Sequence, residues 1–413
     1  MKKLFVIILV LCLAFAGVAG YLSYNGDSSG VSRPAVTAAP TEEPEADDYA
    51  DSGDGIVVDG GESAGQSLDL EALYALHAPE DVVLTVDGRD VTWDQYFYLL
   101  SYQAVQIENY FLTMSVYYGM EQTWTDMLDE NQTYAAYVPV YVEDSLREMY
   151  SIEGFAAANG VALTAEAEAE LQAQRQQDIT DLCGEGATEA DFEAYLAGLN
   201  MSVDTYDWLN RVSTLYQQGY TQLYGENGEL YDADAAIAWL ADNGYVAAHH
   251  ILLMTVDPAS GEALDEGAKA EKLSQIQALL DELNAIEDPT ARLARFEELK
   301  AEYCEDTGKT AYPHGYTFTP GTMVAEFEDA VNAMGDYELS GVVETSYGYH
   351  IIMRLPLRTD GLTMDRDSNG LPMTGRALAS SAIFDDRLQA YFDAIPVTYA
   401  PGFEPVNVSD YLA

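Results

Sequence analysis

The longest uninterrupted apolar run lies at the N-terminal end of the chain. Two lysines precede a stretch that is apolar from residue 4 to residue 17, and the next three residues are mostly small. A short basic segment followed by such a run is typical of a secretory signal peptide. With Tyr21 and Leu22 added, the run approaches the roughly 20 residues that span a bilayer, as in an uncleaved anchor. We therefore expect residues 1–22 to be a signal peptide or a membrane anchor, and the remainder to be exported.

Small and polar residues dominate the next segment, residues 23–67. It consists largely of Gly, Ser, Ala, Pro, Thr, Asp and Glu, and Arg33 is its only basic residue. A segment with few large apolar side chains and much like charge cannot bury a core. We expect a disordered acidic linker that holds the folded part away from the N-terminal segment.

Residues 68–245 are predicted to form a mostly helical domain. It opens with a short β-like segment, in which apolar residues on both sides of Asp87-Gly88 predict a β-hairpin. Thr92 and Gln95 then form the pattern of a capping box, which starts a long aromatic helix. Further helices are expected around 142–158, from 163, after caps at Thr188 and Asp232, and over 202–224.

The pattern changes in residues 246–357. Val246–Met254 is mostly apolar and typical of a buried strand, and residues 350–353 form a second run of this kind. Between these runs, three segments carry apolar residues at helical spacing. An opening strand, several helices and a closing strand predict a compact α+β domain.

Residues 358–413 begin with a polar loop rich in Asp, Gly and Thr. An amphipathic helix is expected over about 375–395, and a short strand over 397–399. A lone helix is marginal in water, so we expect it to pack back on the N-terminal helical domain.

The charge balance excludes one class of partner. The 413-residue chain has 70 Asp and Glu against 18 Lys and Arg, which gives a formal net charge of −52. Nucleic-acid binding depends on a basic face, so no nucleic-acid partner is expected. The hydrophobic fraction of 48% and the 30 tyrosines still provide enough material for buried cores.

Histidine and cysteine are scarce, with five and three residues respectively. Cys12 lies in the N-terminal apolar run, so only Cys183 and Cys304 can pair, and the sequence leaves open a disulfide or two buried thiols. His250 lies on the opening strand of the α+β domain and His350 on its closing strand. If these strands are neighbours, the two rings face each other on one sheet surface.

Four separated segments of this domain match known motifs in order: 248–252 matches A-x-H-I-L, 303–306 matches Y-S-x-D, 318–330 matches F-x-x-G-x-M-V-x-x-F-E-x-A, and 340–352 matches S-x-P-V-x-T-x-x-G-Y-H-I-I. In these motifs and their order, the domain resembles the parvulin family of peptidyl-prolyl isomerases. The flanking helices and the N-terminal segment are similar in order to the chaperone module of PrsA/SurA-type exported foldases. The fold class that this implies is α+β: a parvulin-like domain, with a small antiparallel sheet and surrounding helices, inserted in a mostly helical chaperone module.

The resemblance also implies which residues form the site. Rotation about an X-Pro amide crosses a barrier of about 18–20 kcal/mol, and a pocket that grips the ring and disfavours amide resonance lowers it without nucleophile, metal or cofactor. Neutral imidazoles that hydrogen-bond each other would supply fixed polar groups at the base of this pocket. The residues are the paired histidines His250 and His350, Asp306 and Thr345 as their hydrogen-bond partners, and Met323, Phe327 and Phe318 as the holders of the proline ring.

One segment departs from the family's pattern. The family's Gly-Gly-Asp-Leu-Gly loop is replaced at residues 311–317 by Ala-Tyr-Pro-His-Gly-Tyr-Thr, so the usual Leu of the proline pocket is missing. This leaves open whether the domain is an active isomerase or an inactive holdase. No basic residue follows His250 before Lys269, so a preference for phosphorylated Ser-Pro is not expected.

Simpler interpretations exist for the individual residues. Taken singly, His250 and His350 are more often satisfied core histidines. A zinc site that adds His249 lacks an HExxH motif or a cysteine pair, and adjacent strand residues point to opposite faces. Cys304, with Lys300 one turn before it, is better explained as a structural thiol. The many tyrosines of the helical domain form a packed core or, in part, a groove for unfolded chains.

The sequence therefore predicts an extracytoplasmic peptidyl-prolyl cis-trans isomerase and chaperone that assists the folding of exported proteins, with no cofactor and no metal. Its partners would be unfolded or partly folded exported polypeptides with X-Pro bonds, and the membrane through residues 1–22. The alternatives are a catalytically inactive holdase of the same fold and, from another class, an extracytoplasmic solute-binding or adhesion protein.

Overall fold

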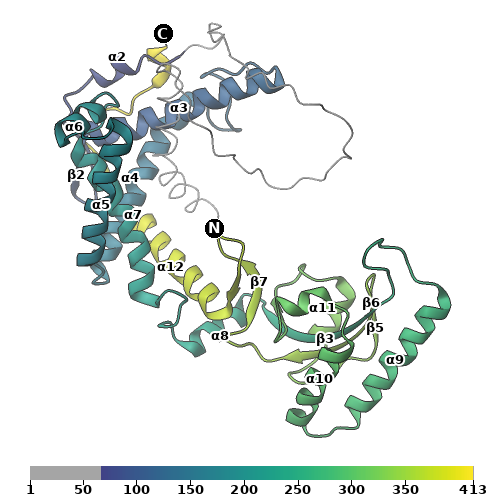
Figure 1. Ribbon diagram of the computed structural model, residues 1–413. Coiled ribbons are helices and arrows are strands. Elements are labelled where there is room, and N and C mark those ends of the chain that lie inside the picture. Colours follow the sequence, from purple (N-terminus) through teal and green to yellow (C-terminus); the bar gives the residue numbers. More distant parts are fainter. Residues whose placement is uncertain (1–66, 413) are drawn as a thin grey trace. The chain divides into compact units, whose positions relative to one another are not determined.

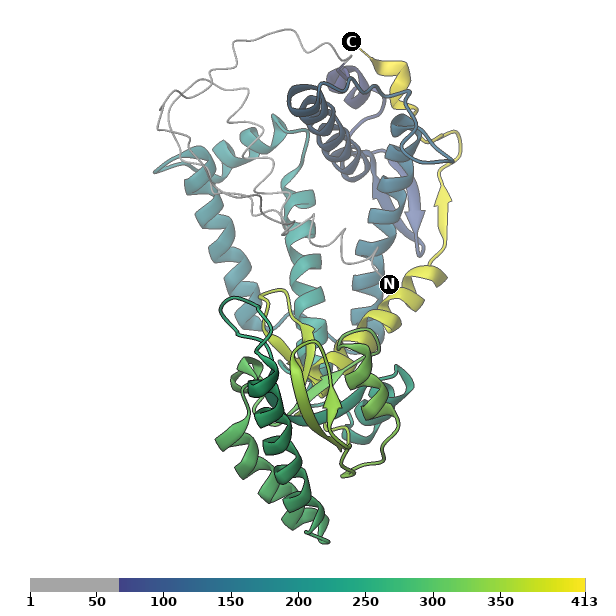
Figure 2. The same cartoon turned by 90° about the vertical axis from the view of Figure 1, so that its right-hand side faces the viewer.

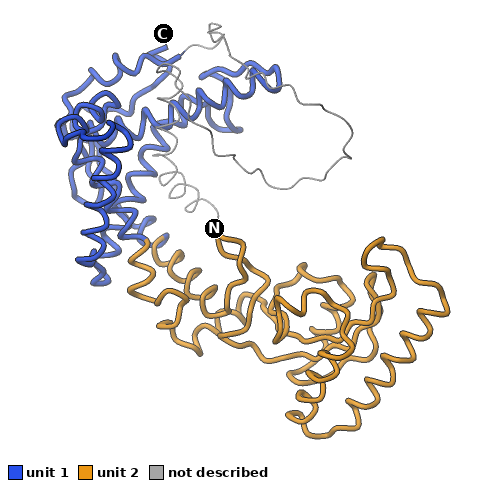
Figure 3. Tube along the Cα trace, in the orientation of Figure 1, with its two compact units in different colours: residues 1–216, 389–413 blue, residues 217–388 orange. Residues whose placement is uncertain are grey.

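The computed structural model describes residues 67–412, which divide into two compact units (Figure 3). In the described part, unit 1 comprises residues 67–216 and 389–412, and unit 2 comprises residues 217–388. The predicted N-terminal segment 1–22 and nearly all of the linker lie outside the described residues. Among the described helices, none combines the length and the apolar character that a bilayer crossing needs.

Unit 1 consists mainly of helices (Figure 1). The predicted hairpin is confirmed as an antiparallel pair, and in Figure 2 the yellow strand β9 lies beside the purple hairpin, so that the strand order is β2-β1-β9. The predicted capping box at Thr92 is present, and Thr188 caps its helix as predicted, there too with a capping box. The elements are α2 (Leu70–Tyr74), β1 (Val82–Val86), β2 (Arg89–Thr92), α3 (Trp93–Tyr118), α4 (Tyr134–Ala158), α5 (Ala165–Cys183), α6 (Glu189–Ala197), most of α7 (Val203–Tyr224), β9 (Val397–Tyr399) and η2 (Val408–Tyr411).

The aromatic residues of α3 divide into a buried and an exposed group. Trp93, Tyr96 and Phe97 near its start are fully buried, and the Trp93 indole donates a hydrogen bond to the carbonyl of Tyr74 (2.8 Å). Towards the other end of the helix, Tyr117 is 78% exposed. The first half of α3 is therefore a core element, and its second half presents apolar surface to solvent.

Unit 2 is organised around a six-stranded sheet with the order β5-β6-β3-β4-β7-β8. The central strand β3 (Val246–Met254) pairs antiparallel with β6 (Gly348–Leu355) and with β4 (Tyr316–Phe318), as predicted for a small antiparallel sheet. The edge strand β5 (Val343–Glu344) pairs with β6. On the other side, β4 pairs in parallel with β7 (Leu362–Arg366) at a single residue pair.

Two features of unit 2 differ from the sequence prediction. The polar segment after residue 357 was expected to be a loop, but it forms the hairpin of β7 and β8 (Pro372–Thr374). The reason is that Leu362 and Met364 pack against the core beside β4, although the intervening residues are polar. Unit 2 also extends beyond the predicted segment 246–357, since it includes α8 (Ala233–Asp242) and most of α12 (Gly375–Ala394).

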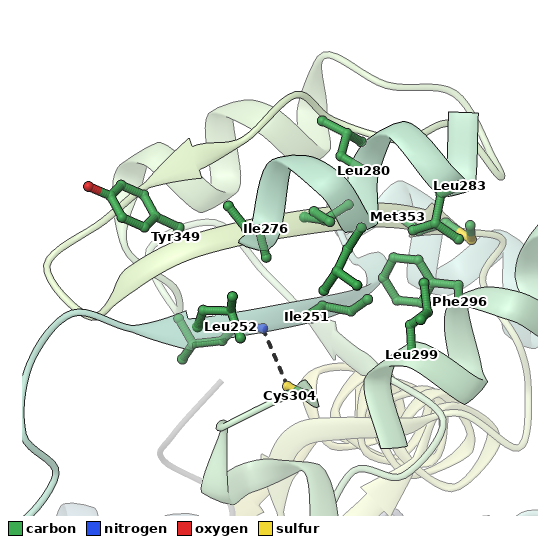
Figure 4. Close-up of a cluster of buried hydrophobic side chains, with 13 residues drawn as sticks. Ile251, Leu252, Ile276, Leu280, Leu283, Phe296, Leu299, Cys304, Tyr349 and Met353 are labelled. Carbon is green, nitrogen blue, oxygen red and sulfur yellow. Dashed lines mark hydrogen bonds between the residues drawn. The ribbon is translucent and has the colours of Figure 1, made fainter. Parts of the chain in front are cut away.

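Two helical layers cover the two faces of this sheet. On one face, α9 (Glu266–Asn284) and α10 (Pro289–Tyr303) pack on β3 and β6, and Figure 4 shows Ile251 and Met353 among the side chains of these helices. On the other face, α11 (Ala325–Asn332) packs through Phe327 and Val331 on Ala248 and Ile352. Neighbouring residues of β3 point to opposite faces, so His250 lies towards α11 and His249 towards α10.

Gly348 starts β6 in a conformation that only glycine adopts easily. Its φ is +149°, and a Cβ there would overlap the carbonyl oxygen of Leu253 and lie 2.8 Å from the amide nitrogen of Thr255. Gly348→Ala is therefore expected to lower the free energy of unfolding by about 3 kcal/mol, measured by urea denaturation of the full chain. Gly341→Ala is the control, because no atom lies within 4 Å of its added Cβ. Equal stability of the two variants would contradict this role of Gly348.

Candidate active site

The register of β3 and β6 brings the two predicted histidines together. His250 lies opposite Ile352, and Leu252 lies opposite His350, so the histidines are diagonal neighbours on one face of the sheet. Their ring centroids are 5.3 Å apart and the rings meet edge to face at 80°. The predicted juxtaposition of His250 and His350 is confirmed.

The predicted hydrogen bond between the two imidazoles is wrong. Both rings are buried, and neither His250 Nδ1 nor His350 Nδ1 has a hydrogen-bond partner. Each ring is held through its other nitrogen: His250 Nε2 lies 3.1 Å from Asp306 Oδ2, and His350 Nε2 lies 2.8 Å from Thr345 Oγ1. The perpendicular packing of the rings explains the difference, because an edge-to-face contact does not align a donor with a lone pair.

Asp306 lies between the end of α10 and the 3-10 helix η1 (Thr307–Thr310). It is the N-terminal cap of η1. Its Oδ1 accepts a hydrogen bond from Gly308 N (2.9 Å), and its Oδ2 accepts one from Tyr316 Oη (2.5 Å) besides facing His250. Burial favours the neutral acid, but the hydrogen bonds from His250, Tyr316 and Gly308 outweigh it and hold the pKa of Asp306 well below its usual value. An ionised carboxylate only accepts, so His250 Nε2 carries the proton of this contact.

The two histidines have opposite electrostatic surroundings. Burial disfavours the charged form of His250, but the interactions with Asp306 and Cys304 together outweigh burial and raise the pKa of the ring. Burial and the neighbouring His250 lower the pKa of His350 to about 3. His350 is therefore neutral at pH 7, and its contact with Thr345 involves no charge.

Apolar side chains from α11, β4 and the loop between them complete the site. The Phe327 ring packs edge to face on both histidines, with centroid distances of 5.4 Å to His250 and 5.8 Å to His350. Phe318 packs on Phe327 (6.0 Å) and is only 1% exposed, so it supports Phe327 from within the core. Met323 is half-buried against the same cluster. All the predicted site residues thus meet on one face of the sheet.

Sequence reasoning missed the part that Tyr316 plays in this arrangement. The Tyr316 ring stacks on His250 (5.6 Å, 29°), while its hydroxyl donates to Asp306. A signal for it was present, because residues 316 and 318 of a short strand share one face and Phe318 was already assigned to the site. The segment 311–317, which departs from the family's pattern, therefore contributes directly to the site.

Residues on the opposite face stay apart from the site. His249 Nε2 lies 2.8 Å from Glu297 Oε1, and its Nδ1 lies 3.2 Å from Lys300 Nζ. Within residues 67–412, no group of three or more His, Cys, Asp or Glu is arranged to hold a metal ion. Cys183 and Cys304 are both free, and the buried Cys304 Sγ accepts from Leu252 N (3.4 Å; Figure 4), which agrees with a structural thiol.

Comparison with known proteins agrees with this geometry. Residues 250–355 match the family model described as a rotamase, the PPIC-type PPIASE domain. The chaperone SurA of Nitrosospira multiformis is 28% identical over 131 residues, which are 31% of this chain and 30% of that protein. The foldase protein PrsA 1 of Bacillus cereus is 39% identical over 93 residues, which are 22% of this chain and 32% of that protein.

These matches are partial. The chain spans about a third of the length of these two curated relatives. Among solved structures, PrsA from Bacillus subtilis is 16% identical, and the alignment covers 76% of this chain and 90% of that one, with a TM-score of 0.22. Residues 250–355 are thus similar to the PPIC-type PPIASE domain, and the chain is similar over part of its length to the PrsA and SurA proteins, as its sequence motifs predicted.

Proposed function

We propose that the protein is an extracytoplasmic peptidyl-prolyl cis-trans isomerase and chaperone that assists the folding of exported proteins. The observation that carries the proposal is the contact of the His250 and His350 rings under Phe327, within a domain that matches the rotamase family. The expected export of the chain, from its N-terminal sequence, places this activity outside the cytoplasm. Residues 1–22 would tie the protein to the membrane or be removed.

Isomerisation forms and breaks no covalent bond, so the site has only to bind the proline and favour the twisted amide. Resonance keeps an X-Pro amide planar, and that resonance separates charge. Apolar groups such as Phe327 and Met323 disfavour the charge-separated planar form and grip the ring. The buried, unpartnered Nδ1 atoms of His250 and His350 are the polar atoms left to meet the peptide. Asp306 and Thr345 fix both rings, so no reorganisation is needed as the bond turns.

We propose that unfolded client proteins bind to the exposed surface formed by the end of α3 and the loop that follows it. This surface is apolar and is bordered by acidic residues, and the segment 90–146 has no Lys or Arg. An exposed apolar surface of this kind is typical of an interaction site. The apolar patch 110–128 comprises Tyr110, Leu112, Val116, Tyr117, Tyr118, Met120, Met127 and Leu128, all of them exposed.

Replacing Tyr117 and Tyr118 together with Ser is expected to halve, or reduce further, the suppression of client aggregation, measured by light scattering of a denatured protein diluted into buffer. The side chains are 78% and 69% exposed, so the change removes apolar contact area without touching the core. Leu230→Ser and Leu371→Ser, at positions in unit 2 that are 66% and 62% exposed, are the controls. Loss of suppression in the controls alone would contradict the role of the patch.

A test of the whole proposal is the refolding of a protein whose slow phase is set by proline isomerisation. The full chain, added in catalytic amounts, is expected to speed this phase in proportion to its concentration. A second candidate is the inactive holdase, which the altered segment 311–317 favours because Tyr312 and Tyr316 occupy it in place of the family's loop. Suppressed aggregation with an unchanged slow phase would select the holdase.

A further inference from the structure

Tyr316 touches both members of the Asp306–His250 pair. It lies on β4 within the segment that departs from the family's pattern, and it is 7% exposed. Its ring stacks on the His250 imidazole at 5.6 Å, and its hydroxyl donates to Asp306 Oδ2 at 2.5 Å. One side chain thus fixes the plane of the histidine and the position of the carboxylate that binds it.

The surrounding backbone is shaped to accept this hydroxyl. A Cβ on Gly308 would overlap Tyr316 Oη, so the turn after Asp306 has room for the hydroxyl only because residue 308 is glycine. Gly308 N also donates to the other oxygen of Asp306 (2.9 Å). The turn and the tyrosine therefore hold the two oxygens of one carboxylate from two sides.

The chain that leads to Tyr316 is fixed as well. Gly315 has a φ of +99°, and a Cβ there would lie 2.7 Å from the carbonyl oxygen of Ala248 on β3. Two residues before Gly315, the carbonyl oxygen of Pro313 accepts a hydrogen bond from the buried Lys300 side chain (2.9 Å). The close passage over β3 and the bond from Lys300 hold the backbone that leads to Tyr316, whose side chain lies against Asp306 and His250.

We propose that Tyr316 is a positioning residue of the isomerase site, whose hydroxyl holds the Asp306 carboxylate in place and thereby fixes which nitrogen of His250 carries the proton. With Asp306 ionised and accepting, Nε2 of His250 donates, so whenever the ring is neutral its lone pair lies on the unpartnered Nδ1. This inference rests on the proposed function for its catalytic meaning, but the hydrogen-bonded arrangement is testable without it.

The neighbouring Tyr312 provides a matched control. Its ring lies 4.7 Å from that of Tyr316, and it is buried in the same core, but its hydroxyl has no hydrogen-bond partner. Tyr316→Phe and Tyr312→Phe each remove one oxygen from adjacent buried rings. Only the first removes a donor from Asp306, so any difference between the two variants reports on that hydrogen bond.

The first experiment follows the Asp306 carboxyl by carbon NMR and the His250 ring by nitrogen NMR during a pH titration of the full chain. Tyr316→Phe is expected to raise the pKa of Asp306 by about one to two pH units, because one donor to a charged group is lost. Tyr312→Phe is expected to leave it unchanged, and Gly308→Ala to reproduce the rise. The other titratable groups around this pair are Lys300, Cys304, Lys309 and His350, which all variants retain.

The second experiment compares the isomerase kinetics of the same variants on an X-Pro peptide. Tyr316→Phe is expected to lower kcat about tenfold with KM unchanged, since a positioning group acts on the chemical step. A Tyr316→Phe variant that keeps the wild-type kcat and the wild-type Asp306 titration would overturn the proposal. If the wild type shows no isomerase activity but the Asp306 titration shifts as expected, the proposed function fails and the arrangement around Asp306 stands.

Discussion

Replacing His250 and His350 together with Ala is expected to abolish the acceleration of proline-limited refolding. The two rings supply the polar atoms next to Phe327 that a bound X-Pro peptide would meet, and Asp306 and Thr345 hold them in place. Loss of fixed polar groups from a buried site costs about 10²–10³ in rate, which brings the catalysed rate close to the uncatalysed one. The measurement is the slow refolding phase of a client at increasing concentrations of the full chain.

Two controls separate lost chemistry from lost fold in this experiment. His314→Ala changes an exposed histidine of the same unit and is expected to retain wild-type activity. Circular dichroism of the double variant reports whether unit 2 remains folded. A folded double variant that accelerates refolding as well as the wild type would contradict the assigned site.

Replacing Glu148 with Gln is expected to stabilise the protein at neutral and alkaline pH. Glu148 lies on α4, is only 1% exposed, and neither of its carboxylate oxygens has a hydrogen-bond partner. Burial, with a smaller effect from the nearby charge of Asp144, raises the pKa of Glu148 to about 9. The group is therefore neutral in the folded protein at pH 7 and would be ionised in the unfolded chain.

The sign of the pH dependence follows from this difference. Below the ordinary glutamate pKa of 4.5, Glu148 is protonated in both the folded and the unfolded state, so its titration does not change the free energy of unfolding. As the pH rises from there towards about 9, the unfolded state loses its proton first, and unfolding becomes easier by up to about 1.4 kcal/mol for each pH unit. Gln does not titrate, so the variant does not lose stability in this way as the pH rises. We expect its free energy of unfolding to exceed that of the wild type by about 3 kcal/mol at pH 7.

Urea denaturation at several pH values, monitored by circular dichroism, measures this effect. The expected result is similar stability of the wild type and Glu148→Gln near pH 5 and a gap that widens towards pH 8. Glu130→Gln, at an exposed position, is the control and should follow the wild type at every pH. A gap that is constant with pH would show that Glu148 does not titrate in this way.

Local patterns predicted most of the elements. Thr92 and Thr188 were recognised as caps because each is followed three residues later by a side chain that completes the box, and both boxes are present. Val246–Met254 was recognised as a strand with the bounds that it has, because a nearly continuous apolar run marks a strand buried on both faces. The adjacency of His250 and His350 followed once their strands were taken as neighbours.

Features that depend on tertiary packing were not predictable in the same way. The start of α4 at Tyr134 was placed later, because Pro139 interrupts the pattern, although Thr133 caps the helix. The hairpin of β7 and β8 was missed because few of its residues are apolar. The tilt of the histidine rings, and with it the absence of a bond between them, depends on where Phe327 packs, which no local pattern encodes.

The hydrogen bond from Tyr316 to Asp306 is another feature that depends on tertiary packing. It joins residues ten positions apart through a glycine turn and a short strand, and its partners are fixed only when β4 pairs with β3. Such side-chain networks are specified by the assembled fold and not by the composition of one segment.

The measurement that tests the central claim most directly is the cis-trans exchange of an X-Pro peptide, followed by exchange NMR in the presence of the full chain. If His250, His350 and Phe327 form a working isomerase site, substoichiometric protein will raise the exchange rate between the two peptide isomers, and the double histidine variant will not. An exchange rate that stays at the value of the free peptide, with folded wild-type protein present, would contradict the account.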